Sequence, residues 1–270
     1  MPMNPRKLVP TQEPGVLDFA PGAAAAYSLR NLSLSYSGPV VTVRRSIDFS
    51  VADFTATEVS DGTLAAWCMG GDGFVKVWHD QSQNGNDGSQ TTAGREPQIV
   101  DSGVLVTEGG KATLQFDGTD DYLNVGSIGV SASKSVFGIT TASGIVTKPQ
   151  IGFMDGTEDY VPVVAIAGEN IDYRDVDSTT YSVNTNTGVA SADLVSFSVV
   201  LSASELFAAI NGSGGATPIP SFTFSHLRIG ARGLGAWGNY FSGTISELII
   251  YPTDMTALRT RIEGNLAWYY

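Results

Sequence analysis

The clearest pattern in the chain is an alternation of apolar and polar residues at positions 112–116. Ala112, Leu114 and Phe116 would point to one side of an extended chain, and the two residues between them are polar. Turn-forming residues follow at 117–121, and residues 122–125 are again typical of a strand. The pattern predicts a β-hairpin whose strands are 112–116 and 122–125.

Short segments rich in β-branched and aromatic residues recur through the rest of the chain, separated by glycine, proline and other turn formers. The further predicted strands are residues 40–44, 73–78, 135–140, 161–167, 171–173, 181–183, 194–201, 206–210, 222–229 and 241–251. One short helical stretch is expected around residues 64–67. So many short strands are typical of a β-sandwich and not of a parallel α/β fold.

Helices are expected at the two ends of this array of strands. The alanine-rich segment 23–34 predicts a short helix that ends before a Gly-Pro pair. After Pro252, apolar residues spaced by three or four predict one face of a C-terminal helix, namely Met255, Leu258, Ile262, Leu266 and Tyr269. Thr253 or Asp254 is expected to cap that helix. The predicted fold is therefore all-β, a two-sheet antiparallel sandwich with a short N-terminal helix and a C-terminal helix.

The N-terminal residues 1–21 contain five prolines and no periodic apolar face, so they are expected to form an extended arm ahead of a single domain at 22–270. Two roles remain open for this arm. It is either a floppy terminus or a segment that docks on a neighbouring subunit, which would also make the protein a homo-oligomer. The apolar residues available for docking are Leu8, Val9, Val16, Leu17 and Phe19.

Charge and cysteine content exclude several function classes. The formal net charge of −12 disfavours nucleic-acid binding, which needs a cationic surface. Cys68 is the only cysteine, so no intrachain disulfide can form, and with two histidines it gives fewer than the four ligands of a Cys/His zinc site. No apolar segment is long enough to span a membrane, and Pro10 interrupts the only basic start of a signal segment. The chain is therefore expected to fold in a cytoplasm.

Residues 78–87, Trp-His-Asp-Gln-Ser-Gln-Asn-Gly-Asn-Asp, form the most distinctive motif of the chain. Together with Ala-Tyr-Ser-Leu-Arg at 26–30, Tyr-Ser-Gly-Pro at 36–39 and Val-Arg-Arg-Ser-Ile-Asp at 43–48, this motif resembles the opening of the α-L-arabinofuranosidase B catalytic domain. Residues 114–122 and 241–251 are similar to segments of laminin-G-like and concanavalin A-like lectin domains. Both resemblances imply a jelly-roll sandwich over most of residues 23–270.

The resemblance also indicates where the family's catalytic groups would lie. Its acid/base aspartate occupies a glycine-rich loop before a late strand, and Arg232 stands at the matching position. An arginine cannot deliver a proton at neutral pH. The family's nucleophile segment is not found, since Glu158 and Glu169 lack its flanking residues. The paired cysteines of the family are absent as well, so the family's reaction is expected to be lost.

Candidate contact residues lie in two loops. Asp80 and Asn84 could bind sugar hydroxyls or a cation, but hydrogen bonds from these side chains to their own turn are the favoured interpretation. Arg232, Trp237 and Tyr240 are candidates for contact with a glycan or a partner subunit, and core packing is an equal alternative for Trp237. No cofactor is expected. Calcium at the acidic turn, which contains Asp117, Asp120 and Asp121, is the weaker alternative to a solvated turn.

The expected function is that of a non-enzymatic phage virion protein, a capsid decoration or a head or tail fibre. Similar modules are familiar in tailed-phage particles, and this part of the prediction is an analogy. The N-terminal arm would anchor the protein to other virion proteins after assembly in the host cytoplasm, and the sandwich would contact neighbours or host surface glycans. The alternative is a retaining α-L-arabinofuranosidase-type glycoside hydrolase that uses displaced carboxylates. A secreted carbohydrate-binding module is a third possibility.

Overall fold

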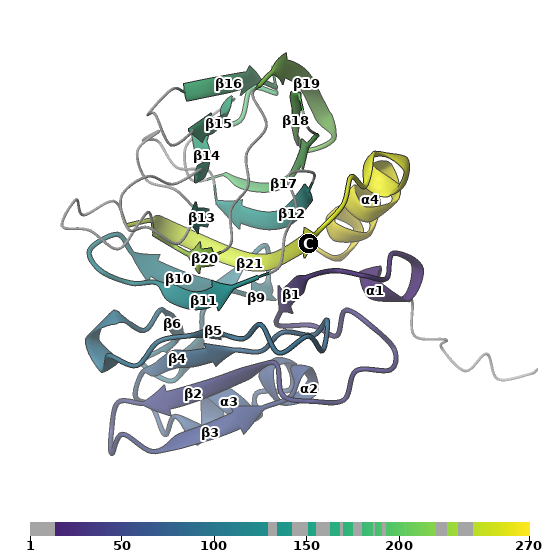
Figure 1. Cartoon of the computed structure of the whole chain (residues 1–270). Coiled ribbons are helices and arrows are strands. Elements are labelled where there is room, and N and C mark those ends of the chain that lie inside the picture. The colour runs from purple at the N-terminus through teal and green to yellow at the C-terminus, as the bar shows by residue number, and fades with distance from the viewer. Residues whose placement is uncertain are drawn as a thin grey trace, which may run out of the picture.

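Two antiparallel sheets stacked face to face make up most of the molecule (Figure 1). The computed structural model describes residues 14–128, 134–141, 151–154, 163–167, 170–174, 180–185, 187–190, 193–202, 204–219, 226–231 and 240–270. The predicted all-β, two-sheet antiparallel sandwich is confirmed, with short helices near both ends of the described chain.

The first sheet is built around the long strand β21 (Ser242–Tyr251). On one edge of β21 the strands follow in the order β12 (Lys134–Thr141), β17 (Leu194–Leu201), β18 (Glu205–Ile210) and β19 (Ser213–Pro218). On the other edge β21 pairs with β1 (Ala25–Ser28) and with β10 (Leu114–Asp117), which occupy successive parts of it. Residues far apart in the sequence therefore meet on β21.

The second sheet runs in the order β3 (Val51–Phe54), β2 (Val41–Arg45), β4 (Gly73–Trp78), β5 (Gly88–Ser89), β11 (Leu123–Ser127), β20 (His226–Ile229), β13 (Ile151–Met154), β14 (Val163–Ala167), β15 (Asn170–Arg174) and β16 (Thr180–Asn184). The two sheets are joined through β6 (Gln98–Asp101), which pairs with β4, β10 and β7 (Val104–Leu105). A separate hairpin consists of β8 (Thr107–Glu108) and β9 (Lys111–Ala112).

The main core fills the space between the sheets because alternate residues of each strand point inward. In β10, Leu114 and Phe116 are buried while Gln115 and Asp117 are exposed. Trp78 at the end of β4 is fully buried, and its ring lies 5.5 Å from that of Tyr27 on β1. The sheets are thus fastened together directly beside the 78–87 motif.

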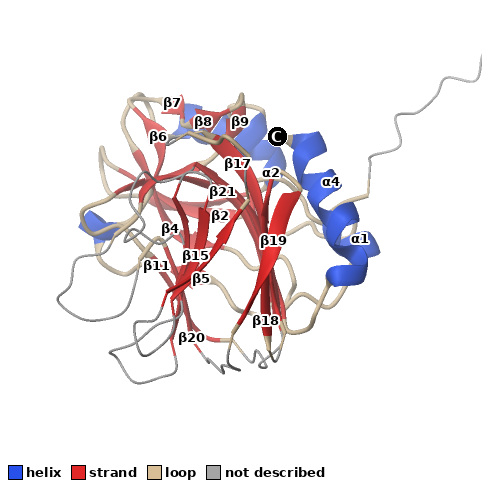
Figure 2. Cartoon of the chain, turned by 90° about the horizontal axis from the view of Figure 1, so that it is seen from above, coloured by secondary structure: helices blue, strands red, loops and turns tan. Residues whose placement is uncertain are grey.

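A second, smaller core covers the outer face of β21 and β12. Helix α4 (Arg259–Tyr269) and the short α1 (Val16–Phe19) lie on the same flank of the sandwich, as Figure 2 shows. Ile262 and Leu266 of α4 pack there against Ile249 and Tyr251. Both faces of β21 are therefore buried from Thr244 onward, and its last four residues, Leu248–Tyr251, are all apolar.

The remaining helices agree with the sequence pattern. Helix α3 (Thr63–Trp67) matches the helical stretch expected at 64–67, and it follows α2 (Ala56–Ser60). The turn η1 (Ala93–Arg95) precedes β6, and η2 (Thr256–Leu258) leads into α4, with Asp254 accepting a hydrogen bond from the N–H of Thr256 at 2.8 Å. The described chain contains no helix of the length and apolar character that a membrane crossing requires.

Two local predictions were wrong. Residues 23–34 do not form a helix, since β1 pairs with residues 247–250 of β21 and this sheet pairing overrides the helix preference of alanine. The strands on either side of the 117–121 turn do not form a hairpin either. β10 lies in the first sheet and β11 in the second, so the turn carries the chain from one sheet to the other.

The expected extended arm is also shorter than predicted. Val16 is fully buried, and Leu17 and Phe19 are partly buried against the second core, so these three residues contact their own chain. Their apolar side chains lie under α4 because the outer face of β21 needs cover. Leu8 and Val9 lie outside the described residues.

Candidate functional site

The 78–87 loop is held by its own side chains. The two carboxylate oxygens of Asp80 accept hydrogen bonds from the N–H groups of Ala26, Ser82 and Asn86, at 2.9, 2.9 and 3.1 Å, and from the Ser82 hydroxyl at 2.8 Å. Asp80 is also buried. Its oxygens are used by the protein itself, which favours the structural role of Asp80 over a sugar or cation contact.

The neighbouring residues of the loop bind the same segment. The Asn84 side-chain amide donates to the carbonyl of Ala23 at 2.8 Å, and the Asn86 amide donates to that of Ala24 at 2.7 Å. Gln81 donates to the carbonyls of Ser28 and Arg30 through its Nε2. The motif that carries the family resemblance therefore fastens residues 23–32 to the sandwich.

The late loop is described only at its end. Tyr240 pairs with Ala231 in an isolated bridge, and its ring stacks on that of Tyr122 with 6.4 Å between centroids. The guanidinium of Arg228 lies 4.4 Å from the centre of the Tyr122 ring. Arg232 and Trp237 lie outside the described residues. Of the three candidates in this loop, Tyr240 alone has a described environment.

Sequence reasoning missed a pocket of about 240 Å³ on the outer face of the joined sheets. We call it the carboxylate pocket, and it is lined by Phe74, Ala93, Gly94, Glu96, Gln98, Gln115, Asp117 and Asp121. Phe74 and Gln98 are cross-strand partners, as are Gln98 and Gln115, so their side chains share one face of β4, β6 and β10. The pocket thus combines one aromatic ring, two amides and three carboxyl groups.

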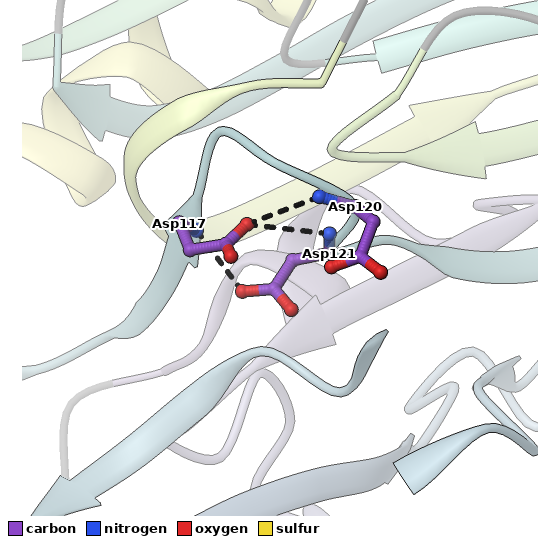
Figure 3. A group of neighbouring side chains, drawn as sticks. All are labelled: Asp117, Asp120 and Asp121. Carbon is purple, nitrogen blue, oxygen red and sulfur yellow. Dashed lines mark hydrogen bonds between the residues drawn. The ribbon is translucent and has the colours of Figure 1, made fainter. Parts of the chain in front are cut away.

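Two of these carboxyl groups come from the turn that crosses between the sheets (Figure 3). Oδ1 of Asp117 accepts hydrogen bonds from the N–H groups of Thr119 and Asp120 at 2.7 and 3.2 Å, and Oδ2 of Asp121 accepts one from the N–H of Asp117 at 3.0 Å. One side-chain oxygen from each of Asp117, Asp120 and Asp121 lies within 4.8 Å of the others. The turn therefore holds its carboxyl groups close together by backbone hydrogen bonds.

The pKa values of the two pocket aspartates are shifted in opposite directions. Burial raises the pKa of Asp121 to about 7, and the negative charges of Asp117, Asp120 and Glu96 add to this, against the effect of the hydrogen bond from Asp117. Burial acts to raise the pKa of Asp117 as well, but backbone hydrogen bonds from residues 119–121 outweigh it and lower that pKa. At pH values above the pKa of Asp117 and below about 7, the pair thus includes one protonated and one ionised carboxyl group.

Glu96 is the third carboxyl group of the carboxylate pocket. Its Oε2 accepts a hydrogen bond from Nε of Arg44 at 2.7 Å, and both side chains are nearly buried. Burial raises the pKa of Glu96 even though Arg44 opposes that shift. Arg44 also donates to the carbonyl of Ala93 at 3.0 Å, which fixes the η1 turn against the pocket.

The three aspartates of the turn also form an oxygen-only group of the kind that hard cations prefer. Calcium takes about six to eight oxygen ligands, and two of the carboxylate oxygens here already accept backbone hydrogen bonds. Asp117 and Thr119 are exposed, as expected of a solvated turn, but Asp121 at its end is buried. Asp121 lies two residues before Leu123, the buried first residue of β11. This spacing is the one sequence signal that pointed to the burial of Asp121.

Solved structures similar to this one include carbohydrate-active proteins. A GH54 α-L-arabinofuranosidase variant soaked with 4-nitrophenyl α-L-arabinofuranoside matches with a TM-score of 0.64 and 16% identity, over 90% of this chain and 62% of that chain. An arabinofuranosidase complexed with arabinofuranosyl-α-1,2-xylobiose matches with a TM-score of 0.63, 17% identity and the same coverage. The fold is shared with arabinofuranosidases. This chain spans less than two thirds of the length of those proteins.

A third match covers nearly all of its counterpart. Domain 4 of AbnA, a GH43 extracellular arabinanase from Geobacillus stearothermophilus, in complex with arabinotriose, matches with a TM-score of 0.51 and 12% identity, over 91% of this chain and 98% of that chain. No known family model matches the sequence, and no curated protein does. The resemblance to an arabinofuranosidase seen in the sequence is thus confirmed for the fold.

These matches contradict two predictions made from the sequence. The expectations of a virion protein and of a non-enzyme are both contradicted, because the structures that match with TM-scores of 0.63 to 0.64 over 90% of this chain are arabinofuranosidases studied with substrates or an inhibitor, which agrees better with the glycoside hydrolase alternative. None of the matches described here links the chain to phage particles. The expected loss of activity rested on Arg232, which lies outside the described residues, whereas the carboxyl groups of the pocket come from residues 96, 117 and 121.

Proposed function

We propose that this domain is a glycoside hydrolase that acts on α-L-arabinofuranosides, with Asp121 as proton donor and Asp117 as nucleophile. The observation that carries the proposal is the pairing of a carboxyl group whose pKa is about 7 with an ionised one in a single pocket. Two carboxyl groups with pKa values moved apart are the usual means by which glycosidases assign acid and nucleophile. The shared fold with arabinofuranosidases supports the substrate class.

The spacing supports a retaining reaction. In retaining glycosidases the carboxyl groups lie roughly 5–5.5 Å apart, and in inverting ones roughly 6.5–9.5 Å. The closest oxygens of Asp117 and Asp121 lie within 4.8 Å. Asp117 would attack the anomeric carbon through Oδ2, which takes no part in the hydrogen bonds to Thr119 and Asp120. Asp121 would give its proton to the departing oxygen as the glycosidic bond breaks. It would then take a proton from the water molecule that attacks the anomeric carbon and releases Asp117 as a carboxylate.

The other lining groups suit a single sugar ring. A volume of about 240 Å³ lies below the roughly 300–1,000 Å³ of pockets for drug-sized ligands. The Phe74 ring offers an apolar surface, and the amides of Gln98 and Gln115 offer donors and acceptors for hydroxyl groups. Glu96, held by Arg44, adds negative charge that keeps Asp121 protonated.

Hydrolysis of 4-nitrophenyl α-L-arabinofuranoside tests this proposal. Asp121→Asn and Asp117→Asn should each lower the rate by roughly 10²–10⁴-fold, the usual contribution of a catalytic acid or nucleophile. The rate of the unmodified protein should fall as the pH rises through about 7, where Asp121 loses its proton. Asp101→Asn, an exposed carboxylate at the end of β6, is the matched control and should leave the rate unchanged.

The product identifies the stereochemistry. Proton NMR during the first turnovers should show arabinose released with the configuration of the substrate. Absence of hydrolysis, or hydrolysis that both Asp121→Asn and Asp117→Asn leave intact, would refute the assignment of these two residues.

A further inference from the structure

A second concave surface lies on the opposite flank of the fold, between α4 and the start of the described chain. We call it the α4 groove. It has a volume of about 530 Å³ and is lined by Pro14, Phe19, Arg261, Gly264, Asn265 and Trp268. That volume falls within the range of roughly 300–1,000 Å³ typical of small-molecule sites. The groove does not share any lining residue with the carboxylate pocket.

Four of the lining residues form one continuous stripe on α4. Positions 261, 264, 265 and 268 follow the three- and four-residue spacing that places side chains on one face of a helix. Gly264 leaves the middle of this stripe open, because a Cβ there would meet no atom within 4 Å. The helix therefore presents a shallow trough with Arg261 at one end and Trp268 at the other.

Trp268 is unusually exposed for so large an apolar side chain. Its relative exposure is 69%, while the opposite face of α4 is buried through Ile262 and Leu266. A tryptophan contributes most to the free energy of binding when a partner covers the face of its ring and its N–H donates a hydrogen bond. Tryptophans are therefore frequent in binding sites. The indole is thus available to a ligand that lies along the groove.

Arg261 is positioned for a negatively charged partner. The central carbon of its guanidinium lies 4.1 Å from the centre of the Phe19 ring, a cation–π contact that does not use the N–H donors for a hydrogen bond. Five other arginines of the described chain have a carboxylate within 4.0 Å, namely Arg30, Arg44, Arg45, Arg95 and Arg259. No carboxylate of the described residues lies that close to Arg261, although the chain has a net charge of −12.

Asn265 is held in place between these two groups. Its Oδ1 accepts a hydrogen bond from Nη2 of Arg30 at 2.8 Å, and its Nδ2 donates to the carbonyl of Pro14 at 3.2 Å. The amide nitrogen carries a second hydrogen that these contacts do not use. A fixed donor thus lies between an open cationic group and an open aromatic face.

We propose that the α4 groove binds a uronic-acid unit of a polysaccharide, as a second carbohydrate site remote from the carboxylate pocket. The Arg261 fork pairs with the sugar carboxylate through two parallel hydrogen bonds, Trp268 covers an apolar face of the sugar chain, and Asn265 donates to a hydroxyl group. A charged sugar explains the unmatched arginine and the exposed indole together, which a neutral sugar does not. The inference rests on the proposed action of the domain on carbohydrates.

Calorimetric titration of the whole chain with trigalacturonate tests this inference, and the fully methyl-esterified trimer has the same rings without the charge. Trigalacturonate should bind, and the ester should bind roughly tenfold more weakly or not at all, because a charge-assisted bidentate contact is lost. Arg261→Gln and Trp268→Ala should each weaken trigalacturonate binding by roughly tenfold. Arg45→Gln, which removes one positive charge at the end of β2, outside the α4 groove, is the control and should bind unchanged.

The outcomes separate this inference from the proposed function. Equal binding of the ester, no binding of trigalacturonate, or equally tight binding of a tetraglutamate peptide would overturn it. Arabinofuranoside hydrolysis should remain in Arg261→Gln and Trp268→Ala, since neither residue lines the carboxylate pocket. Failure of hydrolysis with intact trigalacturonate binding refutes the proposed function and leaves the uronate site standing. Hydrolysis without trigalacturonate binding refutes the uronate site and leaves the proposed function standing.

Discussion

The protonated state of Asp121 makes the stability of the fold depend on pH in a direction opposite to that of an ordinary paired carboxylate. Its pKa is about 7 in the folded protein, against 3.8 for a free aspartate. Between these values the folded chain binds a proton that the unfolded chain releases. The free energy of unfolding should therefore fall as the pH rises from about 4 to about 7, and the loss should be complete above that.

The size of this effect follows from the shift. About three pKa units at roughly 1.4 kcal/mol each give a destabilisation of roughly 4 kcal/mol at alkaline pH. That figure is an upper bound, because relaxation and water entry reduce the penalty of a buried charge. Asp121→Asn removes the ionisation and keeps an oxygen that can accept from the N–H of Asp117. The variant should match the unmodified protein at low pH and exceed its stability at high pH.

Urea unfolding at about pH 4.5 and about pH 8.5 measures the difference, with Asp101→Asn as a control that should show no pH-dependent gain. A carboxyl carbon NMR titration gives the pKa of Asp121 directly. The reasoning is refuted if the stability gain of Asp121→Asn is the same at both pH values, or if the Asp121 carboxyl group titrates near 4. Asp121→Asn should thus be more stable at high pH and unable to hydrolyse the substrate, which is the combination expected when a catalytic acid destabilises the fold.

Three further predictions concern groups outside the pocket. Asp80→Ala should lower the free energy of unfolding in urea by roughly 3 kcal/mol or more, because four hydrogen bonds to one buried carboxylate are lost, and an unchanged midpoint would contradict the structural role. Gly138→Ala should destabilise the fold by roughly 1–3 kcal/mol, since the new Cβ would lie 2.6 Å from the Phe197 ring. Gly264→Ala on α4 should stabilise it by roughly 1 kcal/mol, because a Cβ there meets no atom within 4 Å and alanine favours a helix. Melting temperatures that shift in the same direction for both variants would contradict these predictions. Burial raises the pKa of Cys68 to about 11, so its reaction with a thiol reagent at about pH 8 should be far slower than that of free cysteine, and rapid labelling of the folded chain would show that the site opens.

The sequence was informative where a local pattern and the tertiary environment agree. The strand at 73–78 appears with the predicted bounds, and the apolar face of the C-terminal helix is the one that packs on β21. The alanine-rich segment 23–34 shows the limit, because pairing with a strand more than 200 residues away decided its conformation. Propensity has no information about a partner so distant in sequence.

The carboxylate pocket was even harder to foresee. Glu96 and Asp121 are ordinary surface residue types, and their burial depends on β10 of the first sheet and β4 of the second sheet lying beside β6, which joins the two sheets. The sequence motif at 78–87 drew attention to itself by its density of polar residues, although those side chains serve the turn they occupy. A pocket that forms where two sheets meet takes its residues from separate parts of the sequence, so no short sequence motif predicts it.

The central place of β21 has a consequence for how the protein is made. Ser28, at the end of β1, and Glu247, its partner on β21, are 219 residues apart. At a synthesis rate of about 5–20 residues per second, β1 emerges from the ribosome about 10 to 40 seconds before its partner exists. During that interval the edge of β10 that β21 will cover is also open. The nascent chain therefore has to remain soluble with unpaired strands until the strand that closes the first sheet is translated.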